Sequence, residues 1–128
     1  MLKGWLFLDK PIRMTSYQLV AQVEKKVNYL INQSLKNEVV KVREKPKNQV
    51  RIGHIGTLDP MASGLMILAL GKATRLVEYG MSKDKEYIFT ITWGVDTDSH
   101  DQEGKIISQS NRRAKINEIE KIIIVFCH

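Results

Sequence analysis

A continuous apolar run from Leu65 to Leu70 is the feature that most restricts the fold of this chain. The run has the length of a strand and is bounded by Gly64 and Gly71. An unbroken apolar segment of this length is typical of a strand that is covered on both faces. We therefore expect a buried strand here, and the rest of the chain has to cover it.

The remaining segments mix strand and helix patterns. Further strands are predicted at Gly4–Asp9, at Lys85–Val95 and at Lys105–Ile107. In the second of these the apolar and polar residues alternate, as in a strand with one covered face. Two helices are predicted at Lys72–Met81 and Arg113–Phe126. This mixture predicts the α+β class, with a mixed sheet and flanking helices.

A third helix is predicted to begin after Thr15. Thr15 and Gln18 have the spacing of a capping box, in which each side chain takes up a backbone N–H of the other residue. Apolar residues then recur at helical spacing and predict one buried face: Leu19, Val20, Val23, Val27, Leu30 and Ile31.

The chain is basic, with a formal net charge of +6 over 128 residues. Much of this charge lies in a segment at about residues 32–51, where the helical pattern breaks down. A basic protein of this size often binds a polyanion such as a nucleic acid. The alternatives for the segment are a solvated basic insertion and a specific RNA contact.

Several classes of protein are excluded by composition. The single Cys127 rules out an intramolecular disulfide and a zinc cluster built on cysteine. No apolar run approaches the roughly 20 residues needed to cross a bilayer. The N-terminal segment lacks the apolar stretch and the cleavage site of a signal peptide, so we expect a cytoplasmic protein with no membrane partner.

The chemistry is concentrated at Gly53–Gly64, within a loop expected at Arg51–Gly64. Its three glycines allow the backbone to approach a ligand closely. Asp59 precedes Pro60, which favours an extended backbone at the aspartate. A carboxylate held on such a loop can act as nucleophile, general base or electrostatic stabiliser. The alternative is an Asp-Pro turn without chemistry.

Other candidate sites are weaker. His54 and Asp59 are too few ligands for a structural zinc site, so no metal is expected. The acidic cluster Asp96–Asp101 does not have EF-hand spacing and is interpreted as a turn. Lys72 is followed by Ala73 where a Walker A motif has Ser or Thr, which argues against nucleotide hydrolysis.

Taken together, these segments resemble the TruB family of tRNA pseudouridine synthases. The similarity extends over about residues 4–107 and is interrupted by the basic segment. Four blocks carry it in order: Leu8-Asp9-Lys10-Pro11 with Thr15-Ser16, the Gly53–Gly64 loop, Leu70–Arg75 leading to Asp84–Tyr87, and Gly94 with Thr97-Asp98-Ser99, Asp101 and Gly104.

The resemblance implies an isomerase that converts a T-loop uridine of tRNA, at tRNA position 55, into pseudouridine. It implies no metal and no organic cofactor. The uridine would be flipped out of its loop so that its glycosidic bond is reachable. The base detaches, turns and rejoins the ribose through carbon. The implied partner is tRNA, and the complete enzyme is expected to be a monomer.

The resemblance also implies a role for individual residues. Asp59 is the expected catalytic carboxylate, which attacks the flipped nucleotide at the sugar or at the base ring. Tyr87 matches an active-site tyrosine that packs on the target base, and its aromatic face suits that role. His54, together with Gly56 and Thr57, is expected to contact the RNA. Two further residues, Lys10 and Pro11, match a motif that supports the active-site loop.

Two features depart from the family pattern. Arg13 stands where the family usually has Gly, and the chain ends at His128, before the family's later blocks. Those blocks supply an arginine that pairs with the catalytic aspartate and often a C-terminal RNA-binding module. We therefore expect residues 1–128 to be the N-terminal part of a catalytic domain, with an incomplete fold, little activity, a tendency to associate and no C-terminal module. The alternative function is a truncated, non-catalytic RNA-binding fragment.

Overall fold

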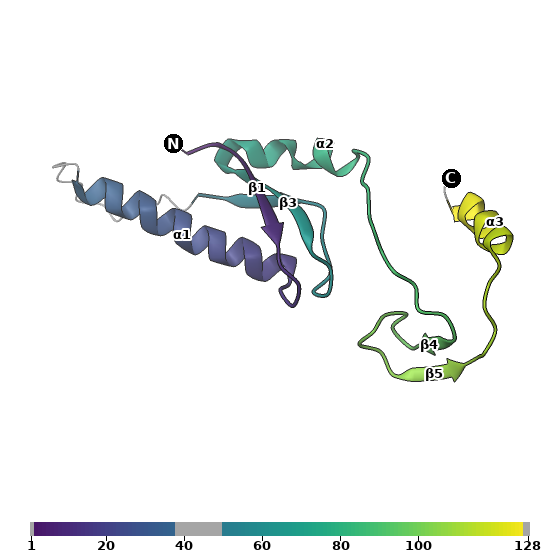
Figure 1. The fold of residues 1–128 in the computed structure, drawn as a ribbon. Helices are drawn as coiled ribbons and strands as arrows, with labels where there is room; N and C mark the ends of the chain where they lie inside the picture. Colours follow the sequence, from purple (N-terminus) through teal and green to yellow (C-terminus); the bar gives the residue numbers. More distant parts are fainter. Residues whose placement is uncertain (1, 38–49, 127–128) are drawn as a thin grey trace. The chain divides into compact units, whose positions relative to one another are not determined.

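The computed structural model describes residues 2–37 and 50–126, and the chain divides into two compact units, residues 1–85 and 86–128. Figure 1 shows the elements of each unit in sequence order. The first unit holds β1 (Gly4–Lys10), α1 (Ser16–Asn37), β2 (Ile52–Ile55), β3 (Gly64–Leu70), a 3-10 helix η1 (Gly71–Leu76) and α2 (Val77–Met81). The second holds β4 (Val95–Thr97), β5 (Ile106–Gln109) and α3 (Ile116–Phe126). The α+β class is confirmed.

The apolar run forms β3, the central strand of a three-stranded antiparallel sheet with the order β1-β3-β2. Leu68 lies opposite Leu6 of β1 and opposite His54 of β2. Residues that lie opposite one another in an antiparallel ladder point to the same face. The expected strand is present, but it is buried mainly in its second half, since Leu65 is 63% exposed. Its register decides which side chains share the face that carries the core.

Helix α1 packs on that face of the sheet. Leu19 of α1 forms the buried core with Met66 and Leu68 of β3, and Leu68 is 0% exposed. Partly buried apolar side chains from β1, β2, α1 and the loops complete the cluster: Leu6, Leu8, Met14, Val20, Val23, Ile52 and Leu58. The core thus lies between α1 and one face of the sheet.

The capping box at the start of α1 is confirmed. The Thr15 N–H donates to Gln18 Oε1 at 2.8 Å, and the Gln18 N–H donates to Thr15 Oγ1 at 3.0 Å. Both bonds are local, so the sequence alone is sufficient to predict where the helix begins. Most of the expected apolar face is at least partly buried, whereas Leu30 is exposed.

The opposite face of the sheet is covered on its β2 side by η1 and α2. Gly53 of β2 lies against Thr74 and Val77, and Gly80 of α2 lies against Ile55. A Cβ at Gly80 would collide with the Ile55 side chain, which would have to move to keep the close approach of α2 to β2. The helix predicted at Lys72–Met81 is present, with its first part wound as the tighter 3-10 form.

Two sequence expectations are wrong. Ile52–Ile55 is a strand, β2, although this segment was expected to belong to a loop. The predicted strand at Lys85–Val95 is absent, and only Val95–Thr97 forms a short ladder, with β5. Residues 85–93 are exposed throughout, and Ile88 is 98% exposed. Alternation shows that a segment suits a sheet, but a strand forms only where a neighbour takes up its backbone N–H and C=O groups.

The basic segment at about residues 32–51 is only partly covered by the structure. Its first residues, Asn32–Asn37, continue α1, and residues 38–49 lie outside the described part of the chain. No helix among the described residues is long and apolar enough to cross a membrane.

The acidic cluster in the second unit is a turn, as predicted, between β4 and β5. Asp101 Oδ1 accepts hydrogen bonds from Ser99 Oγ at 2.6 Å and from the N–H groups of Glu103 and Gly104. Asp98 Oδ1 accepts the Lys105 N–H at 2.9 Å across the turn. The carboxylates therefore hold the connection between the two strands.

We expect Ser99→Ala to raise the pKa of Asp101 towards its ordinary value of 3.8. The hydrogen bond from Ser99, followed by the backbone N–H of Glu103, holds the pKa of this carboxyl below that value. Because the folded pKa is lowered, the ionised carboxylate stabilises the turn above pH 3.8 and loses this effect as pH falls through the lowered pKa. Carbon-detected NMR titration of the Asp101 carboxyl measures the shift. Ser108→Ala on β5 is the matched control, and an equal shift there would contradict the assignment to Ser99.

Candidate active site

The loop that carries Asp59 connects β2 to β3 and is anchored by Leu58. The side chain of Leu58 packs against the core of Leu19, Met66 and Leu68. Its backbone is bound by Ser16, whose Oγ–H donates to Leu58 O at 2.8 Å and whose Oγ accepts the Leu58 N–H at 2.9 Å. The residue before the candidate carboxylate is therefore held by both apolar packing and hydrogen bonds.

Hydrogen bonds also hold the loop on the other side of Asp59. The Ala62 N–H donates to Asp59 O at 3.1 Å, which closes a turn, and the Arg13 N–H donates to Pro60 O at 2.6 Å. Asp59 itself is exposed. An ordered backbone with an exposed aspartate allows the carboxylate to meet a large substrate.

Lys10 is the last residue of β1, and Pro11 begins the loop that follows it. Lys10 is 0% exposed, and its Nζ donates to Pro11 O at 3.0 Å and to Met14 O at 2.6 Å. A lysine is rarely buried without a partner, and here two carbonyl oxygens provide one. These two hydrogen bonds hold residues 10–14 in a loop around the Lys10 ammonium. The same loop contains Arg13, whose N–H donates to Pro60 O.

Arg13 adopts a left-handed backbone, with φ of 63°. Residues with a Cβ seldom do so, whereas glycine does so freely. The turn therefore requires positive φ, which suits the glycine that the resemblance leads us to expect at this position.

We expect Arg13→Gly to raise the free energy of unfolding by up to about 1.6 kcal/mol. The left-handed conformation costs a residue with a Cβ roughly 1–2 kcal/mol, and the greater freedom of glycine in the unfolded chain offsets about 0.4–1 kcal/mol of that. Urea denaturation measures the difference. Arg13→Ala removes the guanidinium but keeps the Cβ, so an equal gain in that variant would contradict the backbone explanation.

His54 and Gly56 are joined at the start of the same loop. His54, at the end of β2, is half-buried, and its Nδ1 lies 2.6 Å from Gly56 O. A carbonyl oxygen only accepts, so Nδ1 carries the proton, and in the neutral ring Nε2 is left as an acceptor. Gly56 has φ of 73°, a left-handed conformation that suits glycine. Thr57 is exposed beside it.

Tyr87 belongs to the second unit and is 61% exposed. Six of the predicted site residues belong to the first unit, namely Lys10, Pro11, His54, Gly56, Thr57 and Asp59, and Tyr87 belongs to the second. The expectation that Tyr87 and Asp59 share one cleft stays a prediction.

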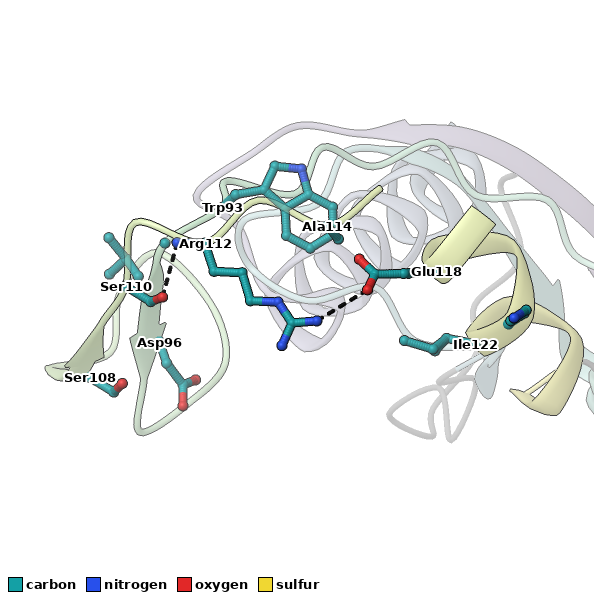
Figure 2. Close-up of a pocket in the computed structure, with 11 residues that line it drawn as sticks. Trp93, Asp96, Ser108, Ser110, Arg112, Ala114, Glu118 and Ile122 are labelled. Atoms are coloured by element: carbon teal, nitrogen blue, oxygen red, sulfur yellow. Dashed lines mark hydrogen bonds and ion pairs between the residues drawn. The ribbon is translucent and has the colours of Figure 1, made fainter. Parts of the chain in front are cut away.

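The second unit contains a hollow of its own, between the β4–β5 hairpin and α3. Figure 2 shows Trp93 at its edge and the ion pair between Arg112 Nη2 and Glu118 Oε1, which are 3.1 Å apart. A bond from the Lys115 N–H and the nearby Arg112 guanidinium hold the pKa of Glu118 below its ordinary value. The hollow contains none of the site residues predicted from the sequence. Within residues 2–37 and 50–126, no three His, Cys, Asp or Glu side chains gather as potential metal ligands.

One residue of the site was missed by sequence reasoning. Ser16 was included in the first matching block but was given no role, although it is buried and contacts the candidate loop. The available signal was a second hydroxyl directly after the cap residue Thr15. A helix start needs only one such cap, which leaves the second hydroxyl for another partner.

Known proteins of one kind match the chain. Residues 43–127 match the family described as TruB family pseudouridylate synthase (N terminal domain). The relative from Zymomonas mobilis, named tRNA pseudouridine synthase B, is 39% identical over 98% of this chain and 36% of its own length. Relatives of the same name from Ehrlichia ruminantium and Opitutus terrae are 38% and 44% identical, over 94% and 84% of this chain.

This chain spans about a third of the length of these relatives, 34–36%. The match nevertheless includes every element that builds the candidate site, because the alignment with the Zymomonas mobilis relative covers 125 residues. The chain belongs to the TruB family of pseudouridylate synthases.

Proposed function

We propose that this chain carries the catalytic carboxylate of a tRNA pseudouridine synthase, with Asp59 as the attacking group. The observation that supports it most directly is the geometry of the loop. The two residues that flank the exposed aspartate are bound to other parts of the first unit, Leu58 by Ser16 and Pro60 by Arg13. The names of the relatives supply the reaction and the class of substrate.

The substrate in this proposal is the T-loop of tRNA, and the reacting nucleotide is the uridine at tRNA position 55. Asp59 attacks the flipped uridine, at the sugar or at the base ring. The bond between N1 and the ribose breaks and a bond between C5 and the ribose forms. C5 loses its proton and N1 takes one up, so the product is an isomer of the substrate. The protein's own residues supply no atoms to it.

Neighbouring residues would bind and orient the RNA. Because the ring of His54 is held through Nδ1, its Nε2 is oriented by the protein and can contact the RNA loop. Gly56, with its left-handed backbone, and the exposed Thr57 follow His54 closely in the chain. Tyr87 would stack on the target base, for which its exposed ring is suited. Lys10 and Pro11 would support the Asp59 loop indirectly, through the loop after β1 that contacts Pro60. A tRNA substrate would place the reaction in the cytoplasm.

The test uses the full-length protein and a tRNA labelled with tritium at C5 of its uracils. We expect label to be released up to one equivalent per tRNA, and none from a tRNA with cytidine at position 55. Release from the cytidine-containing tRNA would contradict the assigned position. Salt-sensitive binding without any release would support the alternative, a non-catalytic RNA-binding protein.

A further inference from the structure

We propose that Ser16 is a positioning residue for Asp59, acting through the backbone of Leu58. This inference rests on the proposed function, in which Asp59 is the attacking group. The Ser16 hydroxyl binds both backbone groups of Leu58, at 2.8 Å to its O and 2.9 Å to its N. Ser16 and Leu58 are 42 residues apart in the chain, so this contact ties the catalytic loop to the start of α1.

The position of the contact matters because of peptide planarity. Leu58 O and Asp59 N belong to one rigid plane, and Asp59 O belongs to the next. The orientation of these two planes decides where the Asp59 side chain points. Ser16 holds the first plane through Leu58 O, and the Ala62 N–H holds the second through Asp59 O at 3.1 Å. Loss of the Ser16 hydroxyl would release the first plane while the second stays bound.

The surroundings of Ser16 make the contact rigid. Ser16 is 4% exposed, so water has little access to compete for the two backbone groups. It is the first residue of α1, a helix of 22 residues whose Leu19 is part of the core. The side chain of Leu58 packs against the same core, which fixes the distance between the two partners.

Capping of the helix does not account for the Ser16 hydroxyl. Thr15 already binds the Gln18 N–H at 3.0 Å, and Gln18 binds the Thr15 N–H in return. The Ser16 hydroxyl binds the loop instead. Two adjacent hydroxyls therefore divide two tasks: Thr15 stabilises the helix start, and Ser16 orients the loop of Asp59.

This division provides a matched pair of variants in the full-length protein. Ser16→Ala and Thr15→Ala each remove one hydroxyl at the start of α1, but only the first removes a contact with the catalytic loop. Ser16→Thr keeps the hydroxyl and serves as the rescue variant. Folded fractions are measured for all three, so that rates refer to folded protein.

The first measurement is amide hydrogen exchange, which does not depend on activity. We expect the Leu58 amide to exchange at least about tenfold faster in Ser16→Ala, with the Ala62 amide unchanged and with Thr15→Ala like the parent. Unchanged protection of Leu58 would overturn the proposal, whatever reaction the protein catalyses.

The second measurement is the single-turnover rate with saturating tRNA. We expect Ser16→Ala to lower this rate by about 10- to 100-fold, since a small misplacement of a reacting group has an effect of that size. The dissociation constant for tRNA should stay within about twofold, because no RNA contact is removed. Ser16→Thr should recover most of the rate, and Thr15→Ala should keep it.

The two proposals fail in different ways. A parental rate in Ser16→Ala, or an equal loss in Thr15→Ala, would overturn the positioning role. Absence of turnover in the parent protein would instead contradict the proposed function, and the exchange measurement would still decide whether Ser16 holds the Leu58 backbone.

Discussion

Asp59→Asn is expected to abolish pseudouridine formation, with a loss of at least about a thousandfold in turnover. An amide has nearly the shape of the carboxylate, but it is neither an effective nucleophile nor a base. Asp59 is exposed, and the loop is held through its backbone, so the fold should be unaffected. Affinity for tRNA should stay close to that of the parent protein. Release of label from uracil C5, measured beside filter binding, separates the two effects.

Glu78→Gln is the control for this experiment. It makes the same change from carboxylate to amide at an exposed position in the first turn of α2. We expect parental turnover from this variant. Turnover retained in Asp59→Asn would remove Asp59 from the attacking role, and an equal loss in Glu78→Gln would show that the net charge matters and not the position.

Leu68→Ala is expected to have the largest effect on stability. Leu68 is 0% exposed at the centre of β3, and truncation of such a side chain removes buried apolar surface and leaves a cavity. The expected loss in the free energy of unfolding is about 2–5 kcal/mol. Urea denaturation monitored by the signal of the first unit measures it.

The same strand offers the control. Leu65→Ala removes the same atoms at a position that is 63% exposed, and we expect a change within about 0.5 kcal/mol. Equal losses in the two variants would mean that the apolar run contributes through strand formation and not through burial. The pair therefore tests whether Leu68 is the centre of the core.

Local features of the fold could be predicted from the sequence because the groups that form them are close along the chain. Thr15 and Gln18 are three residues apart, and their side chains satisfy each other's backbone N–H groups before any tertiary contact is made. The apolar run of β3 is likewise a local pattern, bounded by glycines. Asp59 was selected differently: the composition of its loop and the Asp-Pro pair left a turn without chemistry open, and the resemblance of the loop to the TruB family made it the expected carboxylate.

Strand formation was harder to predict because a strand needs a partner. The alternation at Lys85–Val95 has the strand period, yet the segment forms no ladder among the described residues. Ile52–Ile55 contains a glycine and a histidine and was assigned to a loop, yet it pairs with β3. In both cases the formation of a strand depends on whether another backbone segment lies alongside to pair with it. The periodicity of a sequence does not show which segments will be neighbours.

By itself, the sequence determined the α+β class, the start of α1, the central strand and the candidate carboxylate. Only the tertiary structure decided how Asp59 is held. A lysine and a serine are usually exposed, but here Lys10 is buried and folds the loop after β1 around its ammonium, while Ser16 is buried against Leu58. These contacts become favourable only after α1 and β3 have formed a shared core, because burial removes the competing water and leaves the loop carbonyls to be satisfied by the protein.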